Sequence, residues 1–128
     1  MTDAEINRLA DIIRETAFEI HKFHKHGHLE KIYENALAHR LRKLGLQVDQ
    51  QFPISVYDED GTSLGNYFAD LVVERCLIVE IKAADGIVDA HIAQLLGYLR
   101  SSRFEHGVLI NFGAARFQIR KLKLEVLD

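Results

Sequence analysis

Two consecutive apolar segments constrain the fold of this chain most, because both carry charge within a pattern typical of buried strands. They read YFADLVV and LIVEIK and are separated by the residues ERC. Period-2 alternation puts Leu71 and Val73 on one face of the first strand, and Leu77, Val79 and Ile81 on one face of the second. We expect both apolar faces to join one core.

The charged residues Asp70, Glu80 and Lys82 then share the opposite face. This holds only if the numbers of residues paired across the two strands add up to an even value, as 70 and 80 do. A two-residue turn at Arg75 and Cys76 would give an odd sum and separate the charges. The hypothesis that these three charges form one site therefore predicts a three-residue turn or a bulge between the strands.

Two carboxylates that converge at one point repel each other unless a divalent cation lies between them. Mg²⁺ takes few carboxylates and keeps positions for water and phosphate oxygens. A lysine two residues after the second carboxylate could position the attacking water or stabilise charge on a phosphate. Asp70, Glu80 and Lys82 thus suit metal-assisted phosphodiester hydrolysis. A solvated ion pair between Glu80 and Lys82 at a strand end is the alternative.

The rest of the chain predicts helices on either side of these strands. Thr2 and Glu5 form a capping box pattern before a helix over residues 3–23, and Gly45 follows a second helix over about 29–44. A third helix is expected over residues 88–102. Pro53 separates the expected strands LQVDQ and FPISVYD, which suggests a sheet edge or a bulge. The other expected strands are SLGNYFADLVVE, CLIVEIKA, HGVLINF and FQIRKLKLEVL. This order predicts an α/β (α+β) fold with a mixed sheet, in one domain over residues 1–128.

Polar residues on two of these helices are further candidates. Glu30 lies on the apolar stripe of the second helix, either as a third acidic group aimed at the site or as a helix-dipole carboxylate. Gln94 and Tyr98 are four residues apart on the third helix and share a face, which His91 joins. The alternative for these three is an ordinary surface position.

Composition limits the classes of protein. No apolar run approaches the ~20 residues that cross a bilayer, and the acidic, amphipathic N-terminal segment is unlike a secretory signal. The single cysteine, Cys76, excludes an internal disulfide framework and fits a reducing cytoplasm. A net charge of −3 counts against tight nonspecific DNA binding, but not against a nuclease whose acidic site needs a metal.

Histidines and basic residues form their own clusters. His21, His24, His26 and His28 lie around the end of the first helix and could gather imidazoles for Zn²⁺ or Ni²⁺, or form a solvated helix end. The basic segments HKFHKHGHLEK, HRLRK and RFQIRKLK are the candidate nucleic-acid surfaces, with solvated faces as the alternative.

Five segments taken together resemble one family. GHLEKIY resembles the G-x-x-E-x-x-Y motif of the GxxExxY proteins, a branch of the PD-(D/E)XK nuclease superfamily. YFADLVVE, LIVEIKA, HIAQLLGYL and GVLINFG resemble further blocks of that family, in the same order. The resemblance spans about residues 10–120 and implies a restriction-endonuclease-like αβββαβ core.

The resemblance also implies roles for individual residues. Asp70 and Glu80 correspond to the acidic metal ligands, and the main-chain carbonyl of Ile81 would complete the inner shell. Lys82 corresponds to the lysine of the E-x-K element, and Glu30 to a helix glutamate that contacts the metal or its water.

On the third helix, Gln94 and Tyr98 correspond to the Q-x-x-x-Y element of RecB-like nucleases, which is thought to hold DNA. We group His91 with them as a substrate-binding candidate. Ala69 departs from the proline in the superfamily name, at a position without a chemical role.

The leading hypothesis is a small Mg²⁺- or Mn²⁺-dependent nuclease that acts on nucleic acid, taken to be DNA. A homodimer is a candidate assembly, and no membrane partner is expected. The alternative is a binding or assembly module that kept the fold without turnover. The intact Asp70, Glu80 and Lys82 set argues against the module, because an inactive site has no need of unpaired buried charge. A histidine-cluster metalloprotein is a third interpretation.

Overall fold

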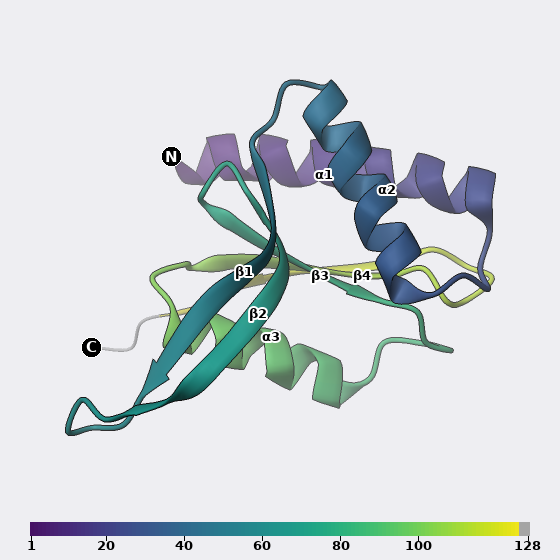
Figure 1. The fold of residues 1–128 in the computed structure, drawn as a ribbon. Coiled ribbons are helices and arrows are strands. Elements are labelled where there is room, and N and C mark those ends of the chain that lie inside the picture. Colours follow the sequence, from purple (N-terminus) through teal and green to yellow (C-terminus); the bar gives the residue numbers. More distant parts are fainter. Residues whose placement is uncertain (126–128) are drawn as a thin grey trace.

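The computed structural model describes residues 1–125 and contains a five-stranded mixed sheet with helices on both faces (Figure 1). This confirms the fold class expected from the sequence. The strands lie in the order β1-β2-β3-β4-β5, and only β3 and β4 run parallel, joined by the crossover helix α3. The elements are α1 (Asp3–His24), α2 (Glu30–Lys43), β1 (Val48–Tyr57), β2 (Ser63–Val73), β3 (Leu77–Lys82), α3 (Asp89–Ser101), β4 (His106–Asn111) and β5 (Gln118–Lys123).

Helices α1 and α2 begin and end close to the predicted positions, for local reasons. The Thr2 hydroxyl accepts the Glu5 N–H at 3.1 Å, and the Glu5 carboxylate in turn accepts the Thr2 N–H, so the predicted capping box forms. Gly45 follows α2 with a φ of 87°, a left-handed conformation that glycine adopts without strain. No helix in the described part of the chain combines the length and apolarity needed to cross a bilayer.

The two faces of the sheet bury separate apolar cores. The core under α1 and α2 includes Leu71, Val73, Leu77, Val79 and Ile81, as the alternation predicted. The core under α3 is formed by Ile54, Ala69, Val72, Ile78, Leu95, Tyr98, Leu99, Phe104 and Leu109. Both faces of β3 are therefore covered, and a polar side chain on this strand can reach solvent only near the strand's end.

The turn between β2 and β3 has the predicted length. Glu74, Arg75 and Cys76 separate the strands, and Leu71 pairs with Val79 in an even-sum register. Glu74 and Arg75 have φ values of 52° and 53°, which close the turn. Extending the same register brings Asp70 level with Glu80.

Strand β1 is a single strand at the edge of the sheet, whereas the sequence suggested two strands separated by Pro53. An edge strand tolerates proline because one side of its backbone has no partner strand. Beyond the sheet, β1 and β2 continue as a projecting hairpin whose turn is closed by the Gly61 N–H donating to the Asp58 carbonyl (Figure 1).

In the middle of this hairpin, the regular alternation of side chains between the two faces of the sheet is interrupted. Ala69 and Val72 pack on the α3 side although their positions differ by an odd number, so strict alternation is broken between them. Opposite Asp70, Gln51 has a φ of 51°, and this pair is missing from a register that otherwise runs unchanged from Val48 to Val56. The local distortion rotates the outer hairpin and places Asp70 at the point of rotation.

Candidate functional site

Strands β2 and β3 separate beyond Leu71, and the candidate site lies at the resulting fork. Their pairing covers Leu71 to Val73 opposite Leu77 to Val79, while β3 continues to Lys82 beside β4. The last residues of β3 therefore have a neighbouring strand on one side only. In Figure 1, β1 and β2 run away from the line of β3 and β4.

The carboxylates of Asp70 and Glu80 bridge the fork in place of regular strand pairing. The Asp70 N–H donates to Glu80 Oε2 at 3.0 Å, and the Ile81 N–H donates to Asp70 Oδ2 at 2.8 Å. Each side chain thus accepts a main-chain donor from the facing strand. The two acidic groups are brought together and fixed in orientation.

Burial makes this acidic pair electrostatically unfavourable when both groups are ionised. Glu80 is only 3% exposed. Desolvation, followed by the hydrogen bond and the negative charge of Asp70, raises the pKa of Glu80 to about 9. The Lys82 charge opposes this shift without cancelling it. In the absence of a cation, Glu80 therefore holds a proton at neutral pH.

Helix α3 supplies the groups that face the end of β3. Lys82 Nζ donates to Gln94 Oε1 at 2.6 Å, which orients the ammonium group. Tyr98 is 7% exposed; burial, then the Glu80 and Asp70 charges, raise its pKa to about 12. His91 instead accepts the Val88 N–H through Nδ1 at 3.2 Å, at the start of α3.

The predicted helix glutamate is not the one linked to this pair. Glu30 is exposed, and the described residues give its side chain no hydrogen bond or ion pair. Glu34, one turn later, is 3% exposed and accepts Gln51 Nε2 at 2.7 Å. The same Gln51 group lies 3.3 Å from Asp70 Oδ1, so Glu34 reaches Asp70 through Gln51.

Glu34 also accepts Gln50 Nε2 at 2.7 Å and the Lys31 ammonium at 2.8 Å. The spacing of residues in the sequence did not lead to the prediction of this network around the buried Glu34. A signal was present, because Glu34 lies three residues before Leu37 and seven before Leu41 on the buried stripe of α2. A charged residue in that stripe needs buried partners.

Tyr33, the last residue of the G-x-x-E-x-x-Y segment, holds the connection between α1 and α2. Its hydroxyl donates to the Lys25 carbonyl at 2.6 Å and accepts the His28 N–H at 3.2 Å. Its ring stacks on Phe112, with 4.6 Å between centroids and 3° between planes. Gly27, with a φ of 114°, permits the bend that Tyr33 closes.

The histidines do not form a metal centre in the described part of the chain. Residues 1–125 contain no group of three or more His, Cys, Asp or Glu side chains placed to hold a metal ion. His21 is buried, with Nε2 2.9 Å from the Ala114 carbonyl. The rings of His24 and His28 lie 5.7 Å apart. The histidine-cluster interpretation is therefore not supported.

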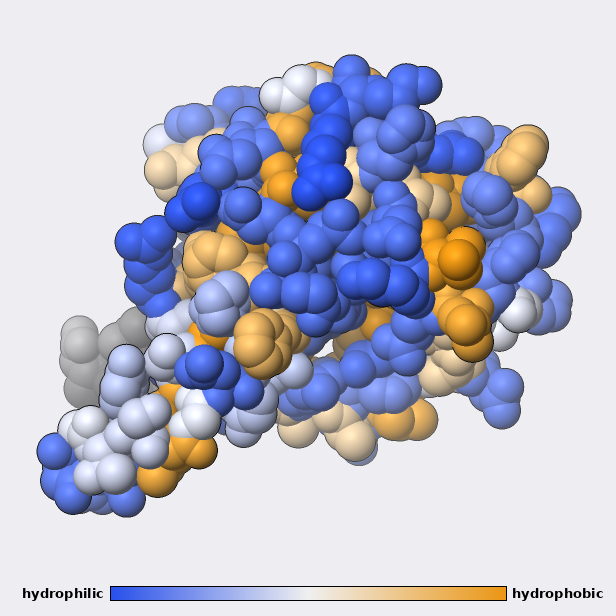
Figure 2. All heavy atoms as spheres, viewed as in Figure 1, coloured by the Kyte–Doolittle hydropathy of each residue, from blue (hydrophilic) through white to orange (hydrophobic). Residues whose placement is uncertain are grey.

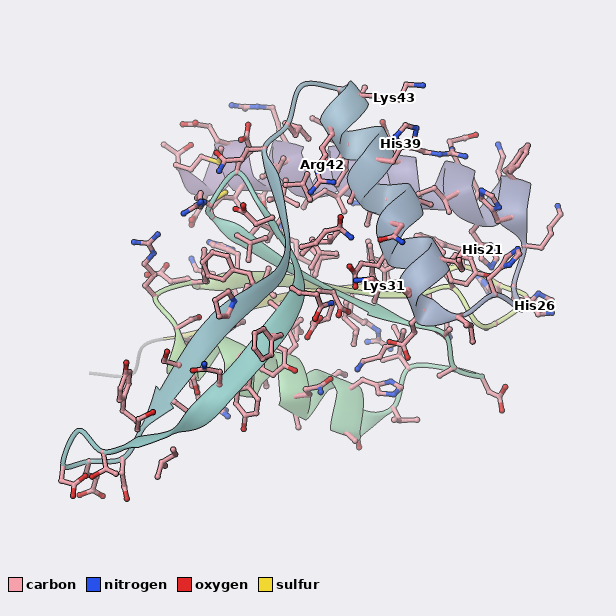
Figure 3. The ribbon with its side chains drawn as sticks, in the orientation of Figure 1. His21, His26, Lys31, His39, Arg42 and Lys43 are labelled. Atoms are coloured by element: carbon pink, nitrogen blue, oxygen red, sulfur yellow. The ribbon has the colours of Figure 1, made fainter. Side chains whose placement is uncertain are left out.

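A group of basic side chains lies along α2 and the connection before it. Figure 3 shows His39, Arg42 and Lys43 along α2, and His21 and His26 near the connection that precedes it. In Figure 2 the surface over α2 is strongly hydrophilic, whereas the projecting hairpin carries paler and apolar surface. Arg42 is partly engaged, since its guanidinium donates to the Val48 carbonyl at 2.8 Å.

Comparison with known proteins agrees with the fold. The sequence model of the PD-(D/E)XK nuclease superfamily matches residues 7–122. A solved structure described as "Crystal structure of SSO0001" has a similar fold, with a TM-score of 0.60 and 18% sequence identity over 75% of this chain. The match covers 50% of that protein's length. No curated protein matches the sequence.

Proposed function

The chain belongs to the PD-(D/E)XK nuclease superfamily, and on that premise we propose that it is a small Mg²⁺- or Mn²⁺-dependent nuclease that hydrolyses phosphodiester bonds in DNA. We further propose that it is a member of the GxxExxY branch, which the segment from Gly27 to Tyr33 supports. One observation carries the proposal. Asp70 and Glu80 meet at the open end of β3, and each accepts a main-chain N–H from the facing strand.

The donor set suits a hard divalent cation. Two carboxylates are enough for Mg²⁺, which commonly takes one or two together with water and substrate phosphate oxygens. Burial, then the hydrogen bond and negative charge of Asp70, raise the pKa of Glu80 to about 9, and a cation between the two carboxylates would stabilise the ionised form. Asp70 and Glu80 would hold the ion with the Ile81 carbonyl. When bound, the ion would act as a Lewis acid on the scissile phosphate and activate water.

The chain's own residues would supply the remaining functions. Lys82, held by Gln94, places a positive charge next to the carboxylate pair, where it would stabilise charge that develops on the phosphate. Tyr98 on α3 lies close enough to Glu80 for that carboxylate's charge to contribute to the raised pKa of the tyrosine. We propose that Gln94 and Tyr98 also position the substrate strand, with His91 and Glu30 at the periphery of the site.

The test is cleavage of single-stranded, duplex and branched DNA with and without Mg²⁺, for wild type and Asp70→Asn. The asparagine keeps an oxygen that can accept the Ile81 N–H, so the variant should fold but lose cleavage. Asp11→Asn is a matched control with the same change in charge. Asp11 pairs with Arg14 at an exposed position on α1, and this variant should cleave as wild type does.

Equal cleavage by Asp70→Asn would remove Asp70 from the mechanism. If no substrate is cleaved, and calorimetry shows neither Mg²⁺ binding nor an effect of Glu80→Ala, the module without turnover becomes the better description. The nuclease would be supported if Asp70→Asn and Glu80→Ala lose both cleavage and Mg²⁺ binding while wild type and Asp11→Asn keep them.

A further inference from the structure

An exposed tyrosine on β2 lies beside the candidate nuclease site and has no role so far. Tyr67 precedes Asp70 by three residues, roughly 10 Å along an extended strand. Its ring centroid is 4.9 Å from that of Tyr98, with 31° between the planes. Tyr98 in turn lies against Glu80, whose charge contributes to its raised pKa. A continuous path of side chains therefore connects Tyr67 to the acidic pair.

The ring of Tyr67 is backed on one side and available on the other. Its cross-strand partner Ile54 is 3% exposed and belongs to the core under α3, so Tyr67 faces the same way. Tyr67 itself remains 45% exposed, although Tyr98 beneath it is 7% exposed. An aromatic ring supported by a second, buried ring forms a preorganised stacking surface.

We propose that Tyr67 is a stacking platform for an unpaired nucleobase, and that the chain therefore acts on single-stranded or frayed DNA. This inference rests on the proposed nuclease function. A base in an intact duplex is stacked on its neighbours and cannot offer its face to a side chain, whereas a single strand can. A base on Tyr67 would place a neighbouring phosphate toward Asp70, Glu80 and Lys82.

The charges around the hairpin favour the same class of substrate. The turn beyond Tyr67 carries the exposed acidic residues Asp58, Glu59 and Asp60. Phosphates of a long duplex lying along the hairpin would meet this negative charge, and the chain has a net charge of −3. Stacking supplies affinity that does not depend on neutralising phosphates.

The test uses the fact that the chain contains no tryptophan. Tyr67→Trp introduces a single fluorophore at the platform, and Tyr57→Trp introduces one at another exposed tyrosine of the same hairpin. Both variants are titrated with a single-stranded oligonucleotide in Ca²⁺, in place of Mg²⁺. Quenching is expected for Tyr67→Trp and not for Tyr57→Trp. Equal quenching of both, or of neither, would overturn the platform.

Measuring how tightly Tyr67 variants bind oligonucleotides shows whether Tyr67 stacks on a base or only shields Tyr98 from solvent. Tyr67→Leu keeps an apolar cover but removes the aromatic face, and Tyr67→Phe keeps both. Tyr67→Leu should weaken binding of the single strand roughly tenfold, Tyr67→Phe should bind within about twofold of wild type, and a blunt duplex should be affected by neither. Wild-type affinity in Tyr67→Leu, or equal losses for single strand and duplex, would contradict the inference.

Cleavage of the same oligonucleotides distinguishes this inference from the function on which it rests. If wild type cleaves with Mg²⁺, Asp70→Asn does not, and Tyr67→Leu cleaves single strands as wild type does, only the platform fails. If wild type neither binds nor cleaves any of the DNA substrates, both fail.

Discussion

Asp70 and Glu80 lie on different strands, yet the Asp70 N–H donates directly to Glu80 Oε2 at 3.0 Å. The contact exists because the even register brings the two residues level just where β2 leaves β3. Regular pairing would have used the Asp70 N–H for a main-chain carbonyl. At the fork this N–H instead meets the buried Glu80 carboxylate, which brings the two acidic groups of the candidate site together.

Replacing Glu80 with glutamine should alter how the free energy of unfolding depends on pH. The pKa of Glu80 is about 9 in the folded chain, against an ordinary value of 4.5, so folding takes up a proton between these pH values. The stabilisation is fully present below about pH 4.5 and is lost as pH rises toward 9, at up to about 1.4 kcal/mol per pH unit. Glu80→Gln keeps a neutral group and lacks this loss.

Thermal unfolding in EDTA at several pH values between 5 and 9 measures the effect. The melting temperature of wild type should fall relative to that of Glu80→Gln as pH rises. Adding Mg²⁺ at the highest pH should raise the wild-type value and leave that of Glu80→Gln nearly unchanged. Parallel pH profiles for the two proteins would show that Glu80 is ionised in the folded chain.

Lys82 should matter to cleavage more than to binding. Lys82→Met keeps much of the side chain's length and removes its charge. We expect single-turnover cleavage to fall about 100-fold or more, the usual range for losing a group that stabilises transition-state charge, with oligonucleotide affinity in Ca²⁺ changed only several-fold.

Gln94→Ala frees Lys82 but leaves its charge, so the loss of cleavage should be smaller than for Lys82→Met. The same single-turnover assay ranks the two variants. A larger loss in Gln94→Ala would mean that Gln94 contributes to catalysis independently of Lys82.

Glu34 should stabilise the fold more than Glu30. Glu34→Ala removes a buried carboxylate that accepts from the Gln50 and Gln51 amides and from the Lys31 ammonium, at a cost of about 1–3 kcal/mol in the free energy of unfolding. Glu30→Ala removes only an exposed charge in the first turn of α2, worth about 0.3–1 kcal/mol. Urea denaturation of both variants checks the order.

The same two variants decide which glutamate serves the site. Cleavage assayed well below the unfolding transition should fall in Glu34→Ala, because Gln51 no longer links α2 to Asp70. Full activity in Glu34→Ala together with a loss in Glu30→Ala would favour the helix glutamate that the sequence resemblance indicated.

Tyr33 should act on stability rather than on chemistry. Tyr33→Phe keeps the stack on Phe112 but leaves the Lys25 carbonyl and the His28 N–H without their side-chain partner. The free energy of unfolding should fall by about 1–2 kcal/mol, with cleavage per folded molecule unchanged. A selective loss of cleavage would place Tyr33 in the substrate's path.

Much of the architecture could be predicted because its causes are local. The capping box at Thr2 and Glu5, the glycine after α2 and the alternation of β3 all depend on residues close together in the chain. The even register between β2 and β3 also followed from the pattern, because an odd register would have turned one apolar face out of the core.

Other parts of the site could not be predicted from spacing. Strict alternation puts Tyr67 on the same side as Leu71, whereas the distortion at Gln51 and Asp70 turns Tyr67 toward Tyr98. Whether Glu30 or Glu34 approaches Asp70 depends on how α2 is rotated against the sheet, and both glutamates fit the helical period.

By itself, the amino-acid sequence determined the elements, the mixed sheet and the register that brings Asp70 level with Glu80. These follow from hydrogen bonding and side-chain periodicity over a few residues. Only the tertiary structure decided that β2 leaves β3 at Asp70, that Glu34 is linked to it through Gln51, and that Tyr67 backs onto Tyr98. Those contacts join residues far apart in the chain, and their geometry is set by how whole helices and strands pack on one another.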